Sequence, residues 1–365
     1  QKINEKWSVG LLLHDNFMYN KNMNFSDNGF RDIPVGNLFS GINRWHYENG
    51  KGTIAQFGIK YLKDDRTGGQ VDFDEGRDKG KTDIYGLGFD NERIEGFAKI
   101  GYVFPQNRLR SIGLLLSASN YKQDSYFGLR NYESEQSNGY ANLIFQDIIG
   151  TVAHKYKIGG SVTYDKYKEN VEAKNFDRVE SVSGVFAEYI FSPSEKFDMV
   201  LGLRQDYNSL YGWFTTPRLV ARYNPFTGNT IRFSTGRGQR TANIFAENMS
   251  MLASSRAINY ASLQNKNDAY GLSPEVSWNT GITIDQNFQF LGRESGISVE
   301  LFHNNFQDQV VVDWENPREV SIYNLDGKSY SNSLQAEFRF MPAPHLEARM
   351  AYRLLDVQTD YKEGR

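Results

Sequence analysis

The sequence predicts an all-β chain that forms part of a transmembrane, antiparallel, up-and-down β-barrel of about fifteen strands. Three observations lead to this fold class. Apolar and polar residues alternate with a period of two along the whole chain, short turns alternate with long loops, and aromatic residues make up 14% of the sequence. A period of two is the repeat of a β-strand whose two faces meet different surroundings.

Composition narrows the alternatives. The chain has 365 residues, a net charge of −3 and no cysteine. The balanced charge offers no basic field to a nucleic acid, and the lack of cysteine excludes disulfides and thiolate metal sites. Mean hydropathy is −0.59, and no apolar run is long enough to predict a transmembrane helix. A transmembrane strand needs only about 9–11 residues, half of them facing lipid, so this hydropathy is compatible with a membrane barrel.

The strands are expected from alternation between turn-forming residues. The first two are separated by a long polar segment, and the second meets the Asn49-Gly50 turn, which tolerates positive φ. A third strand follows at once, with Ala55, Phe57 and Ile59 on one face. Including this third strand, the expected strands are residues 7–13, 38–47, about 53–61, 93–103, 108–120, 136–147, 155–168, 178–191, 197–207, 218–223, 230–237, 275–285, 296–305, 333–340 and 346–352.

The connections and the strand faces favour a membrane barrel over a soluble one. Short turns, such as 105–107 and 341–345, fall at one end of the sheet, and long loops, such as 14–37, 64–92, 121–135 and 241–271, fall at the other. A ring of fifteen or more strands encloses a lumen too wide for side chains to fill, so the apolar face is expected to turn outward to lipid. The soluble alternative, a β-sandwich or a propeller, would show a blade-length repeat in the propeller case, and none is visible.

Residues 231–281 carry the most specific pattern in the chain. A strand with arginine, serine and glycine at alternate positions leads into a long loop, and the next strand opens Leu-Ser-Pro-Glu. This pattern resembles the barrel signature of TonB-dependent outer-membrane receptors. Gln239 and Ala242, where the family usually has an aromatic residue and a proline, resemble its Bacteroidetes-type members. The matching residues are Arg232, Ser234, Gly236, Gly238, Arg240, Glu247, Leu272, Pro274, Glu275, Ser277, Asn279 and Gly281.

The signature residues have a structural interpretation. Glycine on a barrel strand permits close approach where a Cβ would clash, and Pro274 at a strand start costs no ladder hydrogen bond. Arg232, Arg240 and Glu275 are expected to pair on the polar side of the wall. The glycines do not indicate a phosphate-binding loop, because no helix follows them.

The resemblance implies a function that the residues alone do not. Such receptors are integral to the bacterial outer membrane, contact its lipid and lipopolysaccharide, and close a barrel of about twenty-two strands with an amino-terminal plug. The periplasmic TonB protein energises the import of a bulky, scarce solute, here expected to be a metal chelate such as a siderophore, haem or cobalamin. A carbohydrate importer is the variant within the class, and a passive porin or a structural barrel is the alternative outside it. Residues 1–365 are expected to be one barrel segment, incomplete at both ends and without the plug or a signal peptide.

Two groups of residues are candidates for binding. Flat aromatic rings in the expected extracellular loops would stack on a chelate, a corrin or a sugar, or would pack the loops against each other. These are Tyr121, Tyr126, Phe127, Tyr132 and Trp314. The loop after residue 64 clusters carboxylates with glycines, so Asp72, Asp74 and Asp78 are a candidate Ca²⁺ site that lacks the EF-hand spacing; a solvated loop is the alternative. No resident cofactor is otherwise expected, and no catalytic constellation stands out, so we do not expect an enzyme.

Overall fold

The structure is a computed structural model that describes residues 1–21, 24–261, 263 and 269–361. Fifteen strands pair in chain order in one antiparallel meander, and the short β8 (Lys174–Asn175) pairs only with β7. Both the meander and its strand number confirm the predicted fold class. The fifteen strands are β1 (Trp7–Met18), β2 (Val35–Glu48), β3 (Thr53–Gly69), β4 (Gly86–Val103), β5 (Ser111–Phe127), β6 (Arg130–Ile149), β7 (Thr151–Val171), β9 (Arg178–Ser194), β10 (Phe197–Asn208), β11 (Gly212–Tyr223), β12 (Asn229–Arg240), β14 (Glu275–Phe290), β15 (Arg293–Asp308), β18 (Ser329–Ala343) and β19 (Leu346–Thr359).

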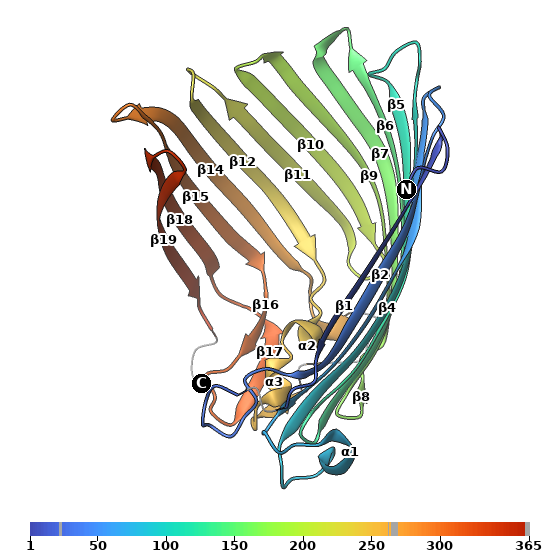
Figure 1. Ribbon diagram of the computed structural model, residues 1–365, viewed down its shortest axis with the longest axis vertical. Coiled ribbons are helices and arrows are strands. Elements are labelled where there is room, and N and C mark those ends of the chain that lie inside the picture. The colour runs from blue at the N-terminus through green and yellow to red at the C-terminus, as the bar shows by residue number, and fades with distance from the viewer. Residues whose placement is uncertain (22–23, 262, 264–268, 362–365) are drawn as a thin grey trace.

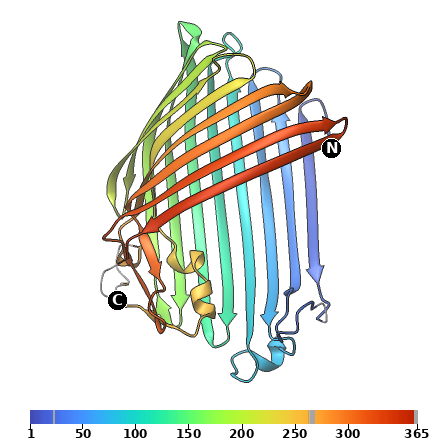
Figure 2. The same ribbon diagram turned by 90° about the vertical axis from the view of Figure 1, so that its left-hand side faces the viewer.

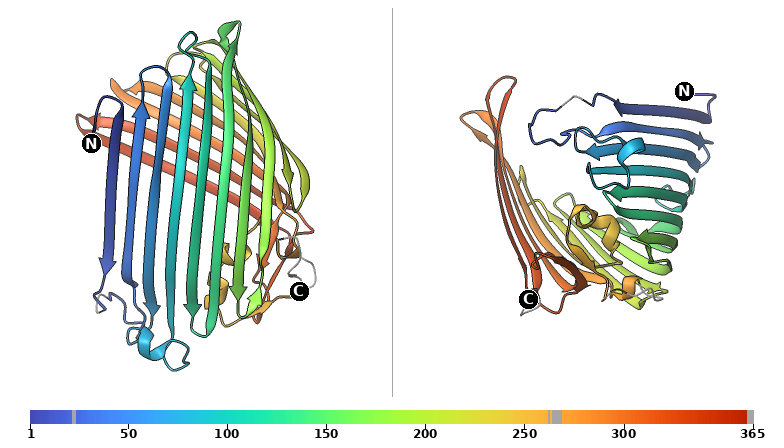
Figure 3. Two further views of the ribbon diagram at one scale, coloured as in Figure 1. Left: turned by 90° about the vertical axis from the view of Figure 1, so that its right-hand side faces the viewer. Right: turned by 90° about the horizontal axis from the view of Figure 1, so that it is seen from below.

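The sheet curves into a wall around a hollow (Figure 1). β1 and β19 do not pair with each other, so the wall is open between them (Figure 3). Seen from the side, β18 and β19 run at a steep angle to β1 and β2 on the opposite wall (Figure 2). This inclination is the strand tilt that a closed barrel requires. Within the part of the chain that the structure describes, no helix is long and apolar enough to cross a membrane.

Strand register assigns each residue to the inner or the outer face. Helices α2 (Ile244–Glu247) and α3 (Ser250–Ala253) lie inside the hollow, so the strand residues that touch them belong to the inner face (Figure 3). Followed through successive pairs from Arg178, the register places Arg204, Arg218 and Gly236 on that face. The residues between them along each strand, including Leu201, Leu203 and Phe233, therefore face outward. The outer face is the apolar one, as predicted.

The turns confirm one part of the predicted loop pattern and correct another. Short connections follow β2, β4, β6, β9, β11, β14 and β18 at the upper end in Figure 1. At the opposite end, however, β5 and β6 are joined by residues 128–129 alone, and β10 and β11 by residues 209–211. The expected loop 121–135 is therefore a long hairpin. The prediction is wrong here because both faces of a strand become polar beyond the apolar belt, so the alternation of apolar and polar residues disappears.

The remaining elements form the main buried core, inside the hollow near the long-loop end. They are α2, α3, the 3₁₀ turn Ala269–Gly271, and a small sheet in which β17 (Glu319–Asn324) lies between β13 (Ala257–Asn259) and β16 (Val310–Asp313). Ile244, Phe245, Met251 and Leu252 are at most 1% exposed, and they pack with the buried strand residues Phe127 and Tyr132. We call the described residues between 241 and 274, together with β16 and β17, the inner loop assembly. A further one-turn helix, α1 (Glu75–Asp78), lies in the loop between β3 and β4.

Candidate functional site

The signature residues form cross-strand pairs on the inner face. β12 and β14 place Ser234 opposite Gly281, Gly236 opposite Asn279, Gly238 opposite Ser277 and Arg240 opposite Glu275. The pattern of alternate positions in the sequence is thus one stripe of small polar residues on two neighbouring strands. A guanidinium group lies at each end of the stripe, Arg232 at one and Arg240 at the other.

Arg240 ties the base of the inner loop assembly to the wall. Its Nε donates to Glu275 Oε2 at 2.6 Å, and its Nη1 and Nη2 each donate to a carboxylate oxygen of Glu247 at 2.9 Å. The Glu247 carboxylate also accepts from the Asn243 backbone N–H at 3.2 Å. The predicted pairing of Arg240 with Glu275 is confirmed, whereas Arg232 pairs with Asp285 instead. The sequence did not identify Glu247 as the second partner of Arg240, although the signature contains it.

The other signature positions differ in how closely they are packed. A Cβ at Gly281 would lie 2.2 Å from the Phe302 ring, so this glycine makes room for an inner-face aromatic side chain. At Gly238 a Cβ would meet nothing within 4 Å, and glycine is not required there by packing. Pro274 directly precedes β14, as expected. Leu272 is 7% exposed, and its carbonyl accepts a hydrogen bond from the Tyr211 hydroxyl at 3.1 Å.

The aromatic candidates do not form one binding surface. Tyr121, Tyr126 and Phe127 lie on β5 and Tyr132 lies on β6, and not in a loop as predicted. Tyr126 faces outward and is 3% exposed, because the loop with α1 covers it: Phe73 packs near its ring and Lys79 Nζ lies 4.4 Å from the ring centroid. Phe127 and Tyr132 face inward and are buried under the inner loop assembly. Of these four residues, Tyr121 is partly exposed on the inner face, and the other three are buried.

Trp314 occupies the loop between β16 and β17 and packs against the same buried core. The Arg256 guanidinium lies 5.3 Å from the centroid of a Trp314 ring, and Arg256 Nη1 donates to the Trp314 carbonyl at 2.6 Å. Its contacts therefore hold the assembly together, which was the alternative role considered for the loop aromatics.

Around Tyr121 the inner wall carries polar side chains that form two neighbouring sets of hydrogen bonds, one centred on Tyr121 and one on Asp165. The Tyr121 hydroxyl donates to Asn91 Oδ1 at 2.9 Å and lies 3.1 Å from Gln123 Oε1. Gln136 Nε2 donates to Asp165 Oδ1 and to the Tyr167 hydroxyl, both at 2.9 Å. Asn138 donates to the same Asp165 oxygen at 2.9 Å. We call Tyr121, Gln136, Asn138, Asp165 and Tyr167 the inner-wall patch; apart from Tyr121, the sequence analysis did not single these residues out.

A buried carboxylate holds the inner loop assembly against the wall beside this patch. Glu169 on β7 is 6% exposed and accepts from the Tyr132 hydroxyl at 2.7 Å and from the Tyr270 hydroxyl at 2.5 Å. The Tyr270 hydroxyl in turn accepts from Arg178 Nη1 at 3.1 Å, and Arg178 also donates to Asn243. Burial, together with the nearby Glu169 carboxylate, raises the pKa of Tyr270 well above its ordinary value. We call the contacts of Glu169, Tyr270 and Arg178 the latch. No sequence motif predicts it, because Glu169 and Tyr270 are 101 residues apart in the chain.

The carboxylates of the α1 loop are engaged separately. Asp78 accepts from Arg77 Nε and Nη2, each at 2.8 Å, and the bound guanidinium lowers its pKa to about 2. Asp74 pairs with Lys21 at 3.3 Å, and the Asp72 carbonyl accepts from Arg77. Among the described residues, no group of three or more histidine, cysteine or acidic side chains could hold a metal ion. The structure therefore does not gather Asp72, Asp74 and Asp78 into the candidate Ca²⁺ site.

A family model described as the β-barrel of TonB-dependent receptor-like proteins matches residues 12–363. The chain belongs to this family. Its members are outer-membrane receptors and transporters and not enzymes, in agreement with the resemblance of residues 231–281. A search of curated protein sequences finds no significant relative of this TonB-dependent receptor barrel.

Solved structures share the fold at low sequence identity. A mutant of the ferric enterobactin receptor of Pseudomonas aeruginosa superposes with a TM-score of 0.67 at 12% identity, covering 97% of this chain and 58% of that one. The haemophore receptor of Serratia marcescens, bound to its haemophore and haem, gives 0.68 at 11%, covering 97% and 59%. A siderophore receptor of Acinetobacter baumannii gives 0.63 at 14%, covering 98% and 61%. The chain thus spans about three-fifths of the length of these receptors.

Proposed function

We propose that the chain is the barrel wall of an energised importer in the bacterial outer membrane, with a metal chelate such as a siderophore, haem or cobalamin as its cargo. TonB is the proposed energy-coupling partner. The family supports the coupling, and the receptors with the same fold carry names that refer to iron siderophores and haem. The division of the wall into an apolar outer face and a polar inner face supports the membrane location.

The observation that carries the proposal is the inner loop assembly. A passive pore needs an open hydrated path, whereas here a buried core of loop residues occupies the hollow and is held by the Glu169 and Arg240 networks. A barrel whose hollow is occupied in this way suits a receptor that captures a bulky ligand before an energised step releases it. The inner-wall patch lies beside this assembly and is the proposed contact surface for the cargo.

A carbohydrate is the second candidate cargo. The inner-wall patch consists of amide, phenol and carboxylate groups, and such groups suit the hydroxyls of a sugar. The neighbouring Arg178, whose guanidinium lies 3.7 Å from the centroid of the Tyr167 ring, is buried and already bonded to Tyr270 and Asn243. A chelate with anionic donor groups would instead be expected to contact cationic side chains. The two cargo classes therefore differ in whether a cation of the inner wall is needed for binding.

The test is uptake by cells that depend on the full-length receptor. We expect accumulation of ferric siderophore, haem or cobalamin that stops when the inner-membrane proton gradient is collapsed or TonB is removed. Gln136→Ala, which exposes Asp165 and Tyr167, is expected to weaken ligand binding at least several-fold, with the outward-facing Lys166→Ala as the matched control. Accumulation that continues unchanged after collapse of the gradient contradicts energised import, and oligosaccharide uptake without chelate uptake selects the second candidate.

A further inference from the structure

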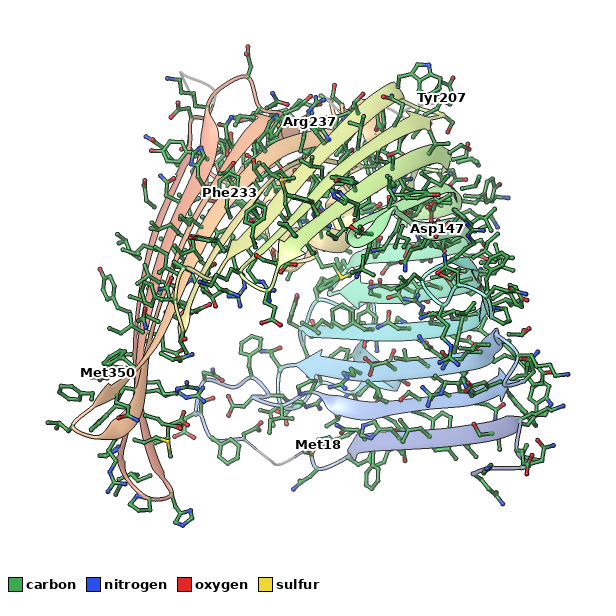
Figure 4. The ribbon with its side chains drawn as sticks, turned by 90° about the horizontal axis from the view of Figure 1, so that it is seen from above. Met18, Asp147, Tyr207, Phe233, Arg237 and Met350 are labelled. Carbon is green, nitrogen blue, oxygen red and sulfur yellow. The ribbon has the colours of Figure 1, made fainter. Side chains whose placement is uncertain are left out.

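The inner face of β1 to β4 carries a pocket of about 340 Å³, which we call the inner pocket. Its floor is formed by Leu12, Ile42 and Leu62, and Leu12 lies opposite Ile42 across the ladder. Successive strand pairs, followed from the inward-facing Tyr121, place all three floor residues on the inner face. β1, whose last residue Met18 is labelled in Figure 4, borders the hollow on this side.

An apolar floor is unexpected on this face of the wall. The hydrated inner side of a barrel is polar, and next to the floor the same face carries Ser40, Arg44 and Lys60. Leu12 is nevertheless 66% exposed, and Ile42 is only partly buried. Exposed apolar side chains gathered in a concave site, with polar groups around them, are typical of a place where a ligand binds.

The charged side of the inner pocket is one carboxylate between two cations. Glu95 Oε1 accepts from Lys60 Nζ at 3.1 Å, and Glu95 Oε2 accepts from Arg93 Nη2 at 2.9 Å. The side chains of Lys60 and Arg93 remain 49% and 50% exposed, whereas that of Glu95 is 18% exposed. No other carboxylate of the described chain forms an ion pair with either cation, since Asp64, further along this face, pairs with Arg66. Two cations and one carboxylate leave the group with a net charge of +1.

The floor and the charges together select one chemical class of ligand. An apolar ring or chain can cover the floor, and one negative charge would balance the net charge of the group beside it. A guanidinium binds a carboxylate with paired, charge-assisted hydrogen bonds, and Arg93 has five N–H donors of which Glu95 occupies one. A dianion such as a phosphate monoester would exceed the available positive charge and would be repelled by Glu95. A sugar would leave the floor uncovered.

We propose that the inner pocket binds a metal-free apolar organic acid, with its ring or chain on Leu12, Ile42 and Leu62 and its carboxylate on Arg93 and Lys60. The floor and the cations recognise the acid itself, and nothing in this arrangement requires a bound metal. The inference therefore goes beyond the proposed import of a chelate and does not depend on it.

The experiment is equilibrium binding of 2-naphthoate to the full-length receptor in lipid nanodiscs, with binding to empty nanodiscs subtracted. We expect saturable binding at concentrations up to about 1 mM. 2-Naphthamide has the same ring system without the charge and is expected to bind about tenfold more weakly or less, because it makes no charge-assisted hydrogen bond. 2-Naphthyl phosphate, which carries a second negative charge, is also expected to bind more weakly than the carboxylate.

Substitutions test the cations and the floor separately. Arg93→Gln is expected to lower the affinity for 2-naphthoate about tenfold while changing the affinity for 2-naphthamide little, and Lys60→Gln repeats this test in case Arg93→Gln impairs folding. Arg44→Gln, on the inner face of β2 but outside the pocket, is the matched control. Ile42→Asn is expected to weaken binding of both probes, with Leu38→Asn on the same face of β2 as its control. The mobility of unheated samples on gels shows that each variant is folded.

Three results would overturn the inference: no saturable binding of 2-naphthoate, equal binding of the acid and the amide, or equal losses in the pocket variants and their controls. The first result would also be expected if another part of the full-length receptor covers the pocket. A receptor that binds 2-naphthoate but fails in the uptake experiment contradicts the proposed import alone. A receptor that imports a chelate but does not bind 2-naphthoate contradicts this inference and leaves the proposed import intact.

Discussion

At the scale of single residues, the family signature is a set of constraints on the inner wall. Glu275 is 8% exposed and shares the Arg240 guanidinium with Glu247 on the inner loop assembly. Burying a carboxylate without a cation or a hydrogen-bond donor costs free energy. Arg240 is therefore needed mainly because it compensates the buried Glu275, since its own side chain is exposed. The sequence pattern predicted the pair because the two residues flank a loop between neighbouring strands. It did not reveal Glu247 as a partner, because that contact depends on how the loop folds.

Replacing Arg240 with methionine is expected to lower the free energy of unfolding by about 1–3 kcal/mol, because Glu275 loses its charged donor. Cleavage of the inner loop assembly by protease should accelerate in parallel. Arg232→Met removes the exposed ion pair with Asp285 and is the control, with an expected cost below about 1 kcal/mol. Equal effects of the two substitutions on denaturant midpoint and protease sensitivity would contradict the proposed anchoring role.

The glycines of the signature are predicted to differ sharply in tolerance. Gly281→Ala places a Cβ 2.2 Å from the Phe302 ring, which must shift, and is expected to cost about 1–3 kcal/mol. Gly238→Ala meets open space and is expected to be neutral or slightly stabilising. Phe302→Leu should restore part of the stability of Gly281→Ala. Denaturant midpoints of the wild type, Gly281→Ala, Phe302→Leu and the double variant would show this coupling. Independent, additive effects would exclude the ring as the cause.

At the scale of elements, alternation predicted the central part of every strand of the meander but not the strand ends. β5 and β6 extend the predicted strands by several residues beyond the apolar belt, through polar residues such as Gln123 and Glu133 that resemble a loop. For the same reason Tyr126, Phe127 and Tyr132 were expected in a binding loop, whereas the structure places them on β5 and β6 in buried positions. The inner loop assembly could not be predicted either, since its core joins β5 and β6 to residues more than a hundred positions later in the sequence.

The latch of this assembly is expected to be sensitive to alkaline pH. The folded pKa of Tyr270 is raised above the ordinary value of about 10, so its contribution to stability is complete below about pH 10 and is lost as the pH rises through the folded value. The backbone of Tyr270, at φ 58°, adds strain that its buried contacts must offset. Limited proteolysis of the loop should therefore accelerate at alkaline pH before the barrel unfolds.

Tyr270→Phe separates this latch from general alkaline damage. At neutral pH it removes one donor from the buried Glu169, so loop cleavage should be faster by about tenfold, corresponding to about 1.4 kcal/mol. Tyr132→Phe removes the other hydroxyl donor to Glu169 but no contact made by a loop residue, and it is the matched control. Identical pH profiles for wild type and Tyr270→Phe would show that another group causes the alkaline sensitivity.

At the scale of the whole molecule, the argument depends on which face of the wall meets lipid. Adjacent residues of β10 separate the two faces: Leu201 points outward, and Val200 points inward with Arg204. An arginine near the bilayer centre costs about 2–4 kcal/mol on a lipid-facing position of a barrel, and little on a hydrated inner wall. Leu201→Arg is therefore expected to reduce folding into lipid vesicles markedly, whereas Val200→Arg should fold nearly as well as wild type. The folded fraction can be measured by the gel mobility of unheated samples and by protease protection. The opposite ranking would place the apolar face inside, and equal tolerance of both substitutions would mean that the sheet is not embedded in the membrane at this level.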